Sequence, residues 1–427
     1  MWSPRGGPDY NGPARMAGPR RQKRFGKVAG PARPGQRGHA QPYVTAEVSP
    51  AAVRANLAAL RERLEPATRL CAVVKSDGYG HGIDLLLPVF REAADCLAVC
   101  TPAEALHLRD LGYGGDVLMF FPPEYWGGEA DQGEVLEELV VGGVTLTVCC
   151  PAAVEAIGQA ARRAAAPAPE AGFARRGPAA VHVKVDTGMT RSGALPADVP
   201  ALVGCIGETD GVNLTGMYTH FAAADESDKG SAREQHRRFL SVVDACGLGG
   251  EVTLHAANSA AIIDLPETQL DMVRPGISAY GYQPSDEMHN RLPLRPALRV
   301  WAPLMQVKDV PAGSGCGYGL TYTFDRPARV GLVPIGYGDG YFRSLSNRAT
   351  MRIRGADAPI RGRVSMDQVI LDLTDVPGAA VGDEVEIISP DPAAPHSVEN
   401  LARLAGTIPY EITCRLTGPR IRRVAAD

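Results

Sequence analysis

The feature that most constrains the fold is a series of short apolar runs, beginning near residue 42, separated by stretches with helical periodicity. Eight of these runs have the length and β-branched content of buried strands. They are residues 70–74, 96–100, 116–121, 144–148, 181–185, 213–219, 252–254 and 269–273. The amphipathic segment 102–112 between two of them ends in a glycine, as helices often do. Eight strands alternating with helices predict an α/β fold with an N-terminal (β/α)8 TIM barrel.

The pattern changes after about residue 290, where short strands follow one another without helices between them. We therefore predict a barrel domain over residues 42–290 and a C-terminal mainly-β domain over residues 291–427. Its predicted strands are 299–310, 329–335, 351–354, 368–373 and 384–388, with one helix over 398–405. Residues 1–41 are rich in Gly, Pro and Arg and predict a disordered basic tail, and 160–180 predicts a helix end with a flexible insertion.

Composition excludes several classes of partner. Lys and Arg number 44 against 48 Asp and Glu, and a net charge of -4 provides no general attraction to nucleic acid or to an anionic membrane. The nine cysteines lack the paired spacing of a zinc site, so we expect no metal and reduced thiols. Since no apolar run is long enough to span a membrane or to serve as a secretory signal, we expect a cytoplasmic protein with a small-molecule substrate.

Polar residues follow several of the predicted barrel strands. Lys75 follows the first strand, Asp186 the fifth, His220 the sixth, residues 255–259 the seventh and Arg274 the eighth. The carboxyl ends of barrel strands open onto one face, where barrel enzymes build their active sites. These residues therefore predict an active site on that face.

Lys75 is the residue of this set that we expect to react. It lies between the apolar run 72–74 and a glycine-rich turn. A lysine among apolar neighbours loses hydration of its ammonium form, and the neutral amine can form an imine with an aldehyde. Pyridoxal 5'-phosphate is the common aldehyde cofactor. Its phosphate would need hydroxyl and backbone N–H donors, and the segment after the last strands, with Ser259 and residues 275–277, lies where barrels commonly bind phosphates.

Nine segments together resemble the motif series of the alanine racemase family, in the family's order. They are residues 72–82, 184–191, 218–221, 255–259, 272–277, 317–319, 334–340, 362–367 and 408–411. The resemblance spans about residues 42–425 and is specific because the motifs occur as an ordered set. It implies a barrel that binds pyridoxal phosphate, a C-terminal β domain, and a homodimer in which each active site borrows residues from the partner.

The resemblance also assigns expected roles to individual residues. The expected catalytic residues are Lys75, Arg274, His220 and Tyr318, the last supplied by the other subunit. The expected cofactor-binding residues are Lys75, Tyr79, Asn258, Ser259, Arg274, Gly276, Ile277 and Tyr410. Arg191 and Met366 match positions near the substrate carboxylate, and Lys184 matches a lysine that some members carbamylate. The expected lining of the access channel is Asp225, Tyr337, Arg343, Arg363 and Ile408.

Racemisation removes a proton from one face of a carbon and returns one to the other, so it requires two bases on opposite sides. Lys75 would serve the D face and Tyr318, as a phenolate favoured by the charge near Arg274 and His220, the L face. Arg274 opposite the pyridine nitrogen would leave that nitrogen unprotonated, which disfavours side reactions. The resemblance implies interconversion of L- and D-alanine, supplying D-alanine for peptidoglycan.

Three alternatives remain open on the sequence. A racemase of another small amino acid, such as serine in secondary metabolism, would use the same chemistry. A barrel that decarboxylates amino acids would share Lys75 but place an acidic residue opposite the pyridine nitrogen, where this chain has Arg274. A regulatory barrel that carries the cofactor without turnover would lack the β domain and its Tyr318.

Overall fold

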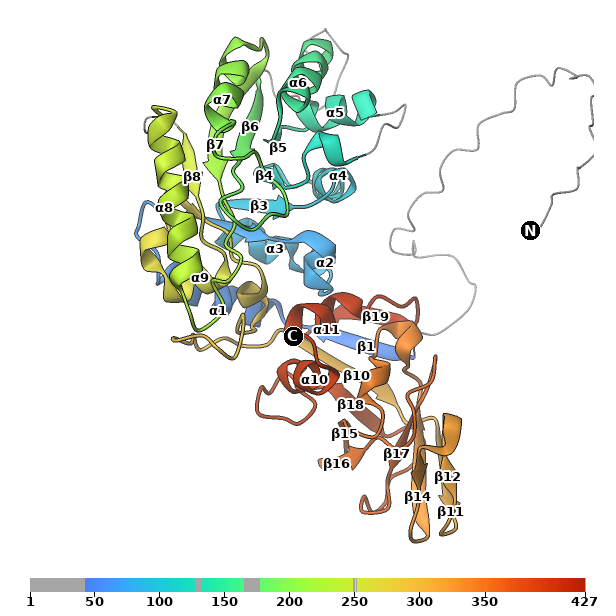
Figure 1. Cartoon of the computed structure of the whole chain (residues 1–427). Helices are drawn as coiled ribbons and strands as arrows, with labels where there is room; N and C mark the ends of the chain where they lie inside the picture. The colour runs from blue at the N-terminus through green and yellow to red at the C-terminus, as the bar shows by residue number, and fades with distance from the viewer. Residues whose placement is uncertain (1–42, 127–131, 165–176, 249, 251, 427) are drawn as a thin grey trace, which may run out of the picture. The chain divides into compact units, whose positions relative to one another are not determined.

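The computed structural model describes residues 43–126, 132–164, 177–248, 250 and 252–426. Eight parallel strands form a barrel in the order β8-β7-β6-β5-β4-β3-β2-β9 (Figure 1). Their bounds are β2 Arg69–Val73, β3 Cys96–Val99, β4 Asp116–Met119, β5 Val144–Val148, β6 Ala179–Lys184, β7 Val212–Tyr218, β8 Thr253–His255 and β9 Met272–Val273. Each lies within about three residues of a predicted strand, and the predicted barrel fold is confirmed.

The barrel closes between β8 and β9, which are short and joined by few hydrogen bonds. The Asp271 N–H donates to the Leu254 carbonyl at 3.1 Å, and the Arg274 N–H donates to the Ala257 carbonyl at 2.9 Å. An isolated parallel bridge pairs Asn258 with Arg274. The seam of the barrel therefore runs through two of the predicted site residues.

The helices that follow the strands lie outside them around the barrel (Figure 1). Their buried apolar residues belong to the hydrophobic core. The helices are α3 Ile83–Ala93, α4 Pro102–Asp110, α5 Gln132–Val141, α6 Pro151–Ala164, α7 Val199–Glu208, α8 Gly230–Ala245 and α9 Ser259–Asp264. Local sequence sets several starts. Thr101 and Glu104 form a capping box on α4, and the Asn258 side chain accepts from Ala261 N–H at 3.0 Å to cap α9. None of the helices in the described residues is long and apolar enough to cross a membrane.

The C-terminal domain is mainly β, as predicted. A six-stranded sheet has the order β16-β15-β18-β10-β1-β19, a three-stranded sheet the order β11-β14-β17, and β12 pairs with β13. The bounds are β10 Leu298–Pro303, β11 Gln306–Val310, β12 Gly315–Cys316, β13 Tyr322–Thr323, β14 Ala328–Val333, β15 Thr350–Ile353, β16 Ala356–Pro359, β17 Val369–Asp372, β18 Glu384–Ile388 and β19 Ile421–Ala425. The domain also contains two helices, α10 Val398–Ala405 and α11 Pro409–Arg415, which pack against each other.

Some details differ from the sequence prediction. The single strand expected over 299–310 is two strands, β10 and β11, which belong to different sheets. Strand β1, Val44–Val48, falls in the segment expected to be barrel, but it pairs antiparallel with β10 and parallel with β19 (Figure 1). A five-residue strand of this kind fits either sheet, and only its long-range partners decide between them. The predicted tail and most of the predicted insertion lie outside the described residues.

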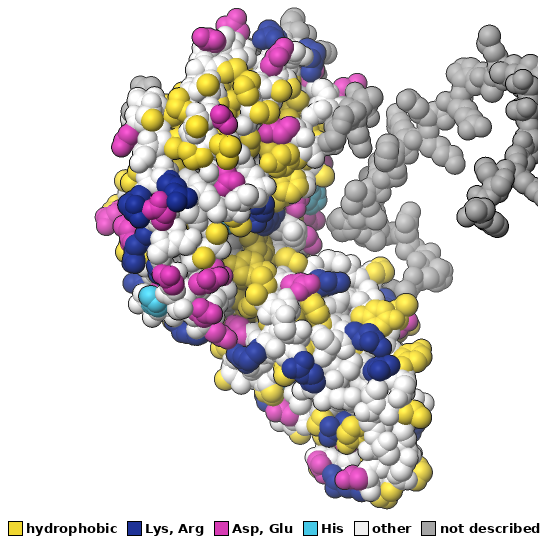
Figure 2. Space-filling view, in the orientation of Figure 1, with side chains coloured by type: hydrophobic (Ala, Val, Ile, Leu, Met, Phe, Trp, Pro, Cys, Tyr) yellow, Lys and Arg dark blue, Asp and Glu magenta, His cyan; other side chains and the backbone are white. Residues whose placement is uncertain are grey.

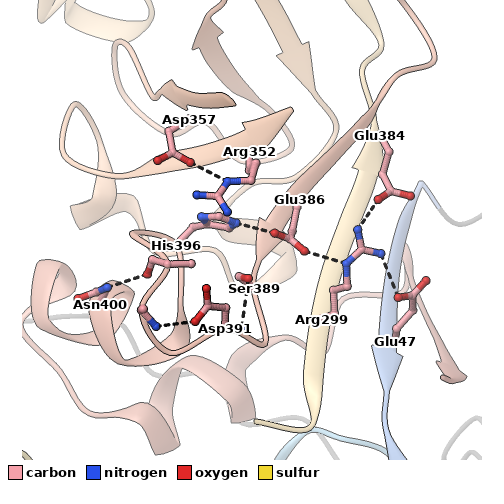
Figure 3. A network of polar contacts seen from close by, with 12 residues as sticks. Glu47, Arg299, Arg352, Asp357, Glu384, Glu386, Ser389, Asp391, His396 and Asn400 are labelled. Carbon is pink, nitrogen blue, oxygen red and sulfur yellow. Dashed lines mark hydrogen bonds and ion pairs between the residues drawn. The ribbon is translucent and has the colours of Figure 1, made fainter. Parts of the chain in front are cut away.

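A polar network crosses the six-stranded sheet around Arg299 (Figure 3). Its guanidinium donates to Glu47 Oε2 at 3.0 Å, to Glu386 Oε1 at 2.8 Å and to Glu384, and so joins β1, β10 and β18. His396 Nε2 lies 2.8 Å from Glu386 Oε2. Burial alone would raise the pKa of Glu386, but the hydrogen bonds from Arg299 and His396 outweigh it and hold the pKa below its usual value.

This network predicts how stability depends on pH. The pKa of Glu386 is lower in the folded protein than in the unfolded chain. The stability that Glu386 contributes is therefore complete above its pKa in the unfolded chain, and it is lost as pH falls through its pKa in the folded protein. We expect Glu386→Gln to lower the free energy of unfolding by about 1–2 kcal/mol at pH ~7, with the difference shrinking between pH ~5 and ~3. Urea-unfolding midpoints measured over this range test it, with exposed Glu65→Gln as control. A difference that does not change with pH would contradict it.

Candidate active site

A cavity of about 690 Å³ opens at the carboxyl ends of the barrel strands. Its wall comes from the turns after the strands, and α11 of the C-terminal domain adds Tyr410 and Cys414. Eleven residues proposed from the sequence line it together: Lys75, Tyr79, Lys184, Arg191, His220, Asn258, Ser259, Arg274, Gly276, Ile277 and Tyr410. Residues separated by more than 300 positions in the chain thus meet at one site.

Lys75 begins an unusual turn. In α2, Lys75–Tyr79, the residues Ser76, Asp77 and Gly78 have φ between 54° and 61°, and Tyr79 has φ 54°. A left-handed conformation costs about 1–2 kcal/mol for each residue other than glycine, so surrounding contacts must hold it. The Ser76 N–H donates to Glu104 Oε1 at 2.6 Å, and the Asp77 carboxylate accepts from the Ile83 N–H at 2.9 Å.

The C-terminal domain packs directly on this turn. A Cβ added to Gly80, where φ is +80°, would lie 2.1 Å from the Thr413 carbonyl oxygen of α11. Arg423 on β19 donates through Nε to the Gly80 carbonyl at 2.8 Å. The rings of Tyr79 and Tyr410 lie 6.0 Å apart. The second domain therefore helps to fix the backbone that carries Lys75.

One end of the cavity has the polar groups of an anion site. The Gly276 N–H donates to Ser259 Oγ at 2.9 Å, and the Ser278 N–H points to the same oxygen at 3.4 Å. A Cβ on Gly276 would lie 2.4 Å from the Tyr79 hydroxyl, so a larger residue there would have to displace the Tyr79 phenol. Two hydroxyls and backbone N–H groups thus converge at the start of the turn after β9, an arrangement suited to a phosphate.

Arg274 is buried at the base of the cavity among histidines. Its Nη1 donates to His255 Nδ1 at 2.6 Å, and its Nη2 lies 3.4 Å from His220 Nδ1. Because a guanidinium cannot accept, His255 Nδ1 is the acceptor, and its protonated Nε2 donates to His182 Nδ1 at 2.9 Å. Burial, followed by the charge of Arg274, lowers the pKa of His255 well below its usual value. Burial also lowers the pKa of Arg274, to about 10, so the guanidinium stays charged at neutral pH.

Lys184 and Arg191 bring two cationic groups to the cavity wall. Asp186 Oδ1 accepts from the Gly188 and Thr190 N–H groups, each at 3.0 Å, and shapes the loop that carries Arg191. Lys184 Nζ donates to Ser192 Oγ at 2.9 Å. Burial and then the positive charge of Arg191 lower the pKa of Lys184 to about 8. A substantial fraction of this amine is therefore neutral near physiological pH.

Seven other proposed residues do not line the cavity of their own chain: Asp225, Tyr318, Tyr337, Arg343, Arg363, Met366 and Ile408. Four of them are large hydrophobic residues with substantial exposure, Tyr318 at 71%, Tyr337 at 44%, Met366 at 55% and Ile408 at 55%. Figure 2 shows hydrophobic side chains gathered over the barrel and again along the C-terminal domain.

Asp225 lies close enough to Tyr410 to affect its phenol. Burial raises the pKa of Tyr410, and the negative charge of Asp225 raises it further.

The cavity also contains residues that the sequence analysis did not propose. Cys100 and Phe120 directly follow β3 and β4, so the rule that polar or functional residues follow barrel strands could have drawn attention to these turns. His182 lies inside β6 and contacts Arg274 only through His255, so no signal in the sequence points to it. In the described residues no cluster of His, Cys, Asp or Glu could hold a metal ion.

The fold and cavity define a class: a parallel barrel enzyme with a lysine at the strand ends, joined to a β domain. A family model for the N-terminal domain of alanine racemase matches residues 48–284, and one for its C-terminal domain matches 297–425. The chain is 38% identical to an alanine racemase of Desulfovibrio desulfuricans over 90% of its own length and 98% of that protein.

Solved structures of alanine racemases have the same fold as this chain. Alanine racemase from a D-cycloserine-producing Streptomyces lavendulae superposes with a TM-score of 0.80 at 36% identity, over 91% of this chain and 98% of that one. The Bacillus anthracis alanine racemase with bound L-Ala-P has a TM-score of 0.77 at 28% identity, over 92% and 96%. The chain belongs to the alanine racemase family.

The environment of Lys184 makes a prediction that needs no cofactor. Since the charge of Arg191 disfavours the ammonium form, Arg191→Gln should raise the pKa of Lys184 and move its pH profile upward. In the wild type, the extent of Lys184 acetylation by acetic anhydride, measured by mass spectrometry as a function of pH, should have its midpoint at about pH 8. Lys308, exposed on β11, is the internal control and should not respond. A Lys184 profile that Arg191→Gln leaves in place would contradict the assignment.

Proposed function

We propose that this chain is a pyridoxal-phosphate-dependent alanine racemase that interconverts L- and D-alanine, supplying D-alanine for peptidoglycan. The observation that carries the proposal is the common cavity of Lys75, Arg274 and the polar groups around Gly276. Family membership supports the same activity. A decarboxylase is disfavoured, because the buried charge that faces the cavity is a guanidinium and not a carboxylate.

The residues present fit the cofactor. The cradle of Tyr79, Ser259 and Gly276 would hold the phosphate, with Ile277 and Tyr410 beside it. Asn258 lies in the same wall and caps α9. Pyridoxal phosphate, when bound, supplies an aldehyde that links to amines and withdraws electrons from the attached amino acid. Lys75 would hold the aldehyde, and Arg274 would face the pyridine nitrogen.

The residues of the chain would then divide the proton transfers. Lys75 Nζ, once free, would take or return the proton on the D face. Arg274 is held by His255, by the Thr219 carbonyl at 2.7 Å and by the Ala256 carbonyl at 3.0 Å, so its guanidinium is fixed in place. Because its pKa stays at about 10, this guanidinium keeps its proton and would leave the pyridine nitrogen unprotonated, which favours reprotonation at the α-carbon.

Tyr318 would be the base on the L face, in the site of a second copy of the chain. Its side chain is exposed and does not line the cavity of its own chain. Leu320, Met366 and Ile408 are also large hydrophobic residues with exposed side chains, and exposed apolar residues of this kind are common in homodimer interfaces. Homodimerisation would bring the phenol to the partner's cavity.

The remaining assignments follow the same proposal. Arg191 and Met366 would bind the substrate carboxylate, with Met366 supplied by the partner. Asp225, Tyr337, Arg343, Arg363 and Ile408 would line the access channel. A pKa of about 8 makes Lys184 a candidate for carbamylation, which requires the neutral amine. A cytoplasmic location is supported by nine cysteines that are all unpaired, the state that a reducing compartment maintains.

Solvent-deuterium exchange at the α-carbon tests the two bases separately. We expect Lys75→Ala to lose exchange mainly from D-alanine and Tyr318→Phe to lose it mainly from L-alanine, by about 100-fold or more. NMR of each alanine enantiomer in deuterated buffer measures both rates, with wild type as reference. Equal loss from both enantiomers in both variants would contradict the division of roles. Comparing rates on alanine and serine decides the substrate.

Complementation tests whether the sites are shared. Lys75→Ala and Tyr318→Phe homodimers should both be nearly inactive, but a mixed dimer should contain one complete site. Random exchange of subunits makes about half of the dimers mixed, so about a quarter of wild-type activity should return. No recovery, although subunit exchange is shown by mass spectrometry, would mean that both residues act from the same chain.

A further inference from the structure

The segment that carries Tyr318 has few buried contacts of its own. It is the loop between β12 and β13, and Tyr318 and Leu320 are 71% and 67% exposed. Its backbone nevertheless adopts a left-handed conformation at three residues, with φ of 67° at Gly317, 70° at Gly319 and 47° at Leu320. A left-handed leucine persists only where neighbouring groups hold it. The glycines let the loop lie close to Gly362 and Arg363, and hydrogen bonds from neighbouring segments add to this contact.

Asn347 makes side-chain hydrogen bonds that reach the loop from a neighbouring segment. Its Nδ2 donates to Thr321 Oγ1 at 3.2 Å and lies 3.4 Å from the Thr321 carbonyl oxygen. Its Oδ1 accepts from the Gly362 N–H at 2.6 Å. One carboxamide thus joins the Tyr318 loop to the segment that leads to Met366. Asn347 is itself left-handed, with φ 59°, a conformation that asparagine tolerates better than most residues.

The neighbouring residue strengthens the same junction. Ser346 Oγ accepts from the Val364 N–H at 2.9 Å and donates to the Arg343 carbonyl. Residues 346 and 347 therefore contact the chain segments next to Tyr318, Arg343, Arg363 and Met366. These are residues that, under the proposed function, enter the partner's active site.

We propose that Asn347 is a positioning residue that sets where the Tyr318 phenol lies in the partner's cavity. The inference rests on the proposed function, because it needs Tyr318 to act as the L-face base. A misplacement of about 1 Å can lower the rate of a catalytic step by about 100-fold. Loss of the Asn347 hydrogen bonds, which we call the Asn347 clamp, should therefore lower the rate measurably. Lys75 lies on another element and should be unaffected.

Three variants separate the contacts. Asn347→Asp keeps the acceptor for Gly362 N–H and removes the two donors to Thr321. Asn347→Gly removes the whole side chain without straining the left-handed backbone, as alanine would. Thr321→Val removes one acceptor of the carboxamide and keeps the other. The matched control is Asn400→Asp, which removes a 2.7 Å bond from Nδ2 to the Ala394 carbonyl elsewhere in the same domain.

The readout is the ratio of deuterium exchange from L-alanine to that from D-alanine. We expect Asn347→Asp and Asn347→Gly to lower L-alanine exchange by at least about 10-fold and D-alanine exchange by no more than about 2-fold. Thr321→Val should fall between these variants and wild type, and Asn400→Asp should leave the ratio unchanged. Sedimentation and thermal unfolding show whether each variant remains a folded dimer.

A merely structural role would lower both exchange rates together, and that result or an unchanged ratio would overturn the proposal. If Asn347→Gly does not fold, Asn347→Asp and Thr321→Val decide in the same way. Tyr318→Phe, measured in parallel, distinguishes an error in the role of Asn347 from an error in the role of Tyr318. If it lowers L-alanine exchange selectively while the Asn347 variants do not, only the clamp is wrong. If it does not, the proposed function fails and the clamp with it.

Discussion

The closure of the barrel between β8 and β9 is the constraint on which the rest of the site depends. These two strands contain only three and two residues, and the bridge between Asn258 and Arg274 continues their pairing into the turns. This pairing directs the Arg274 guanidinium to the base of the cavity, where His255 and two backbone carbonyls hold it. An isolated buried cation would be costly, so the histidine chain and the carbonyls are needed to keep it charged there.

The second constraint is the packing of the C-terminal domain on the turn after Lys75. The left-handed turn is unfavourable by itself, and α11 and β19 press on it through the contacts of Gly80 with Thr413 and Arg423. Strand β19 is held in turn by β1, the first strand in the described part of the chain. The six-stranded sheet, with Arg299 at its centre, therefore supports the lysine as well as its own domain.

Much of the fold and of the candidate site could be predicted from local pattern. The eight barrel strands were visible because apolar runs of strand length are bounded by glycines and helical segments, and Lys75 and Arg274 were visible because they directly follow such runs. The assignment of β1, the division of 299–310 into two strands and the helix α11 were missed. Strand β1 pairs with β10 and β19, hundreds of residues away, β10 and β11 separate because they pair in different sheets, and α11 packs on α10 and on α2. A local pattern does not contain these partners.

By itself, the sequence determined the alternation of strands and helices, the residues at the strand ends and the ordered motifs of the family, because these follow from periodicity and from residue type. Only the tertiary structure decided that His182 and His255 form a chain behind Arg274, that burial and Arg191 together lower the pKa of Lys184, and that Tyr318 is exposed on a loop clamped by Asn347. Burial, charge separation and hydrogen-bond geometry depend on distances in space, and these distances exist only once the chain has folded.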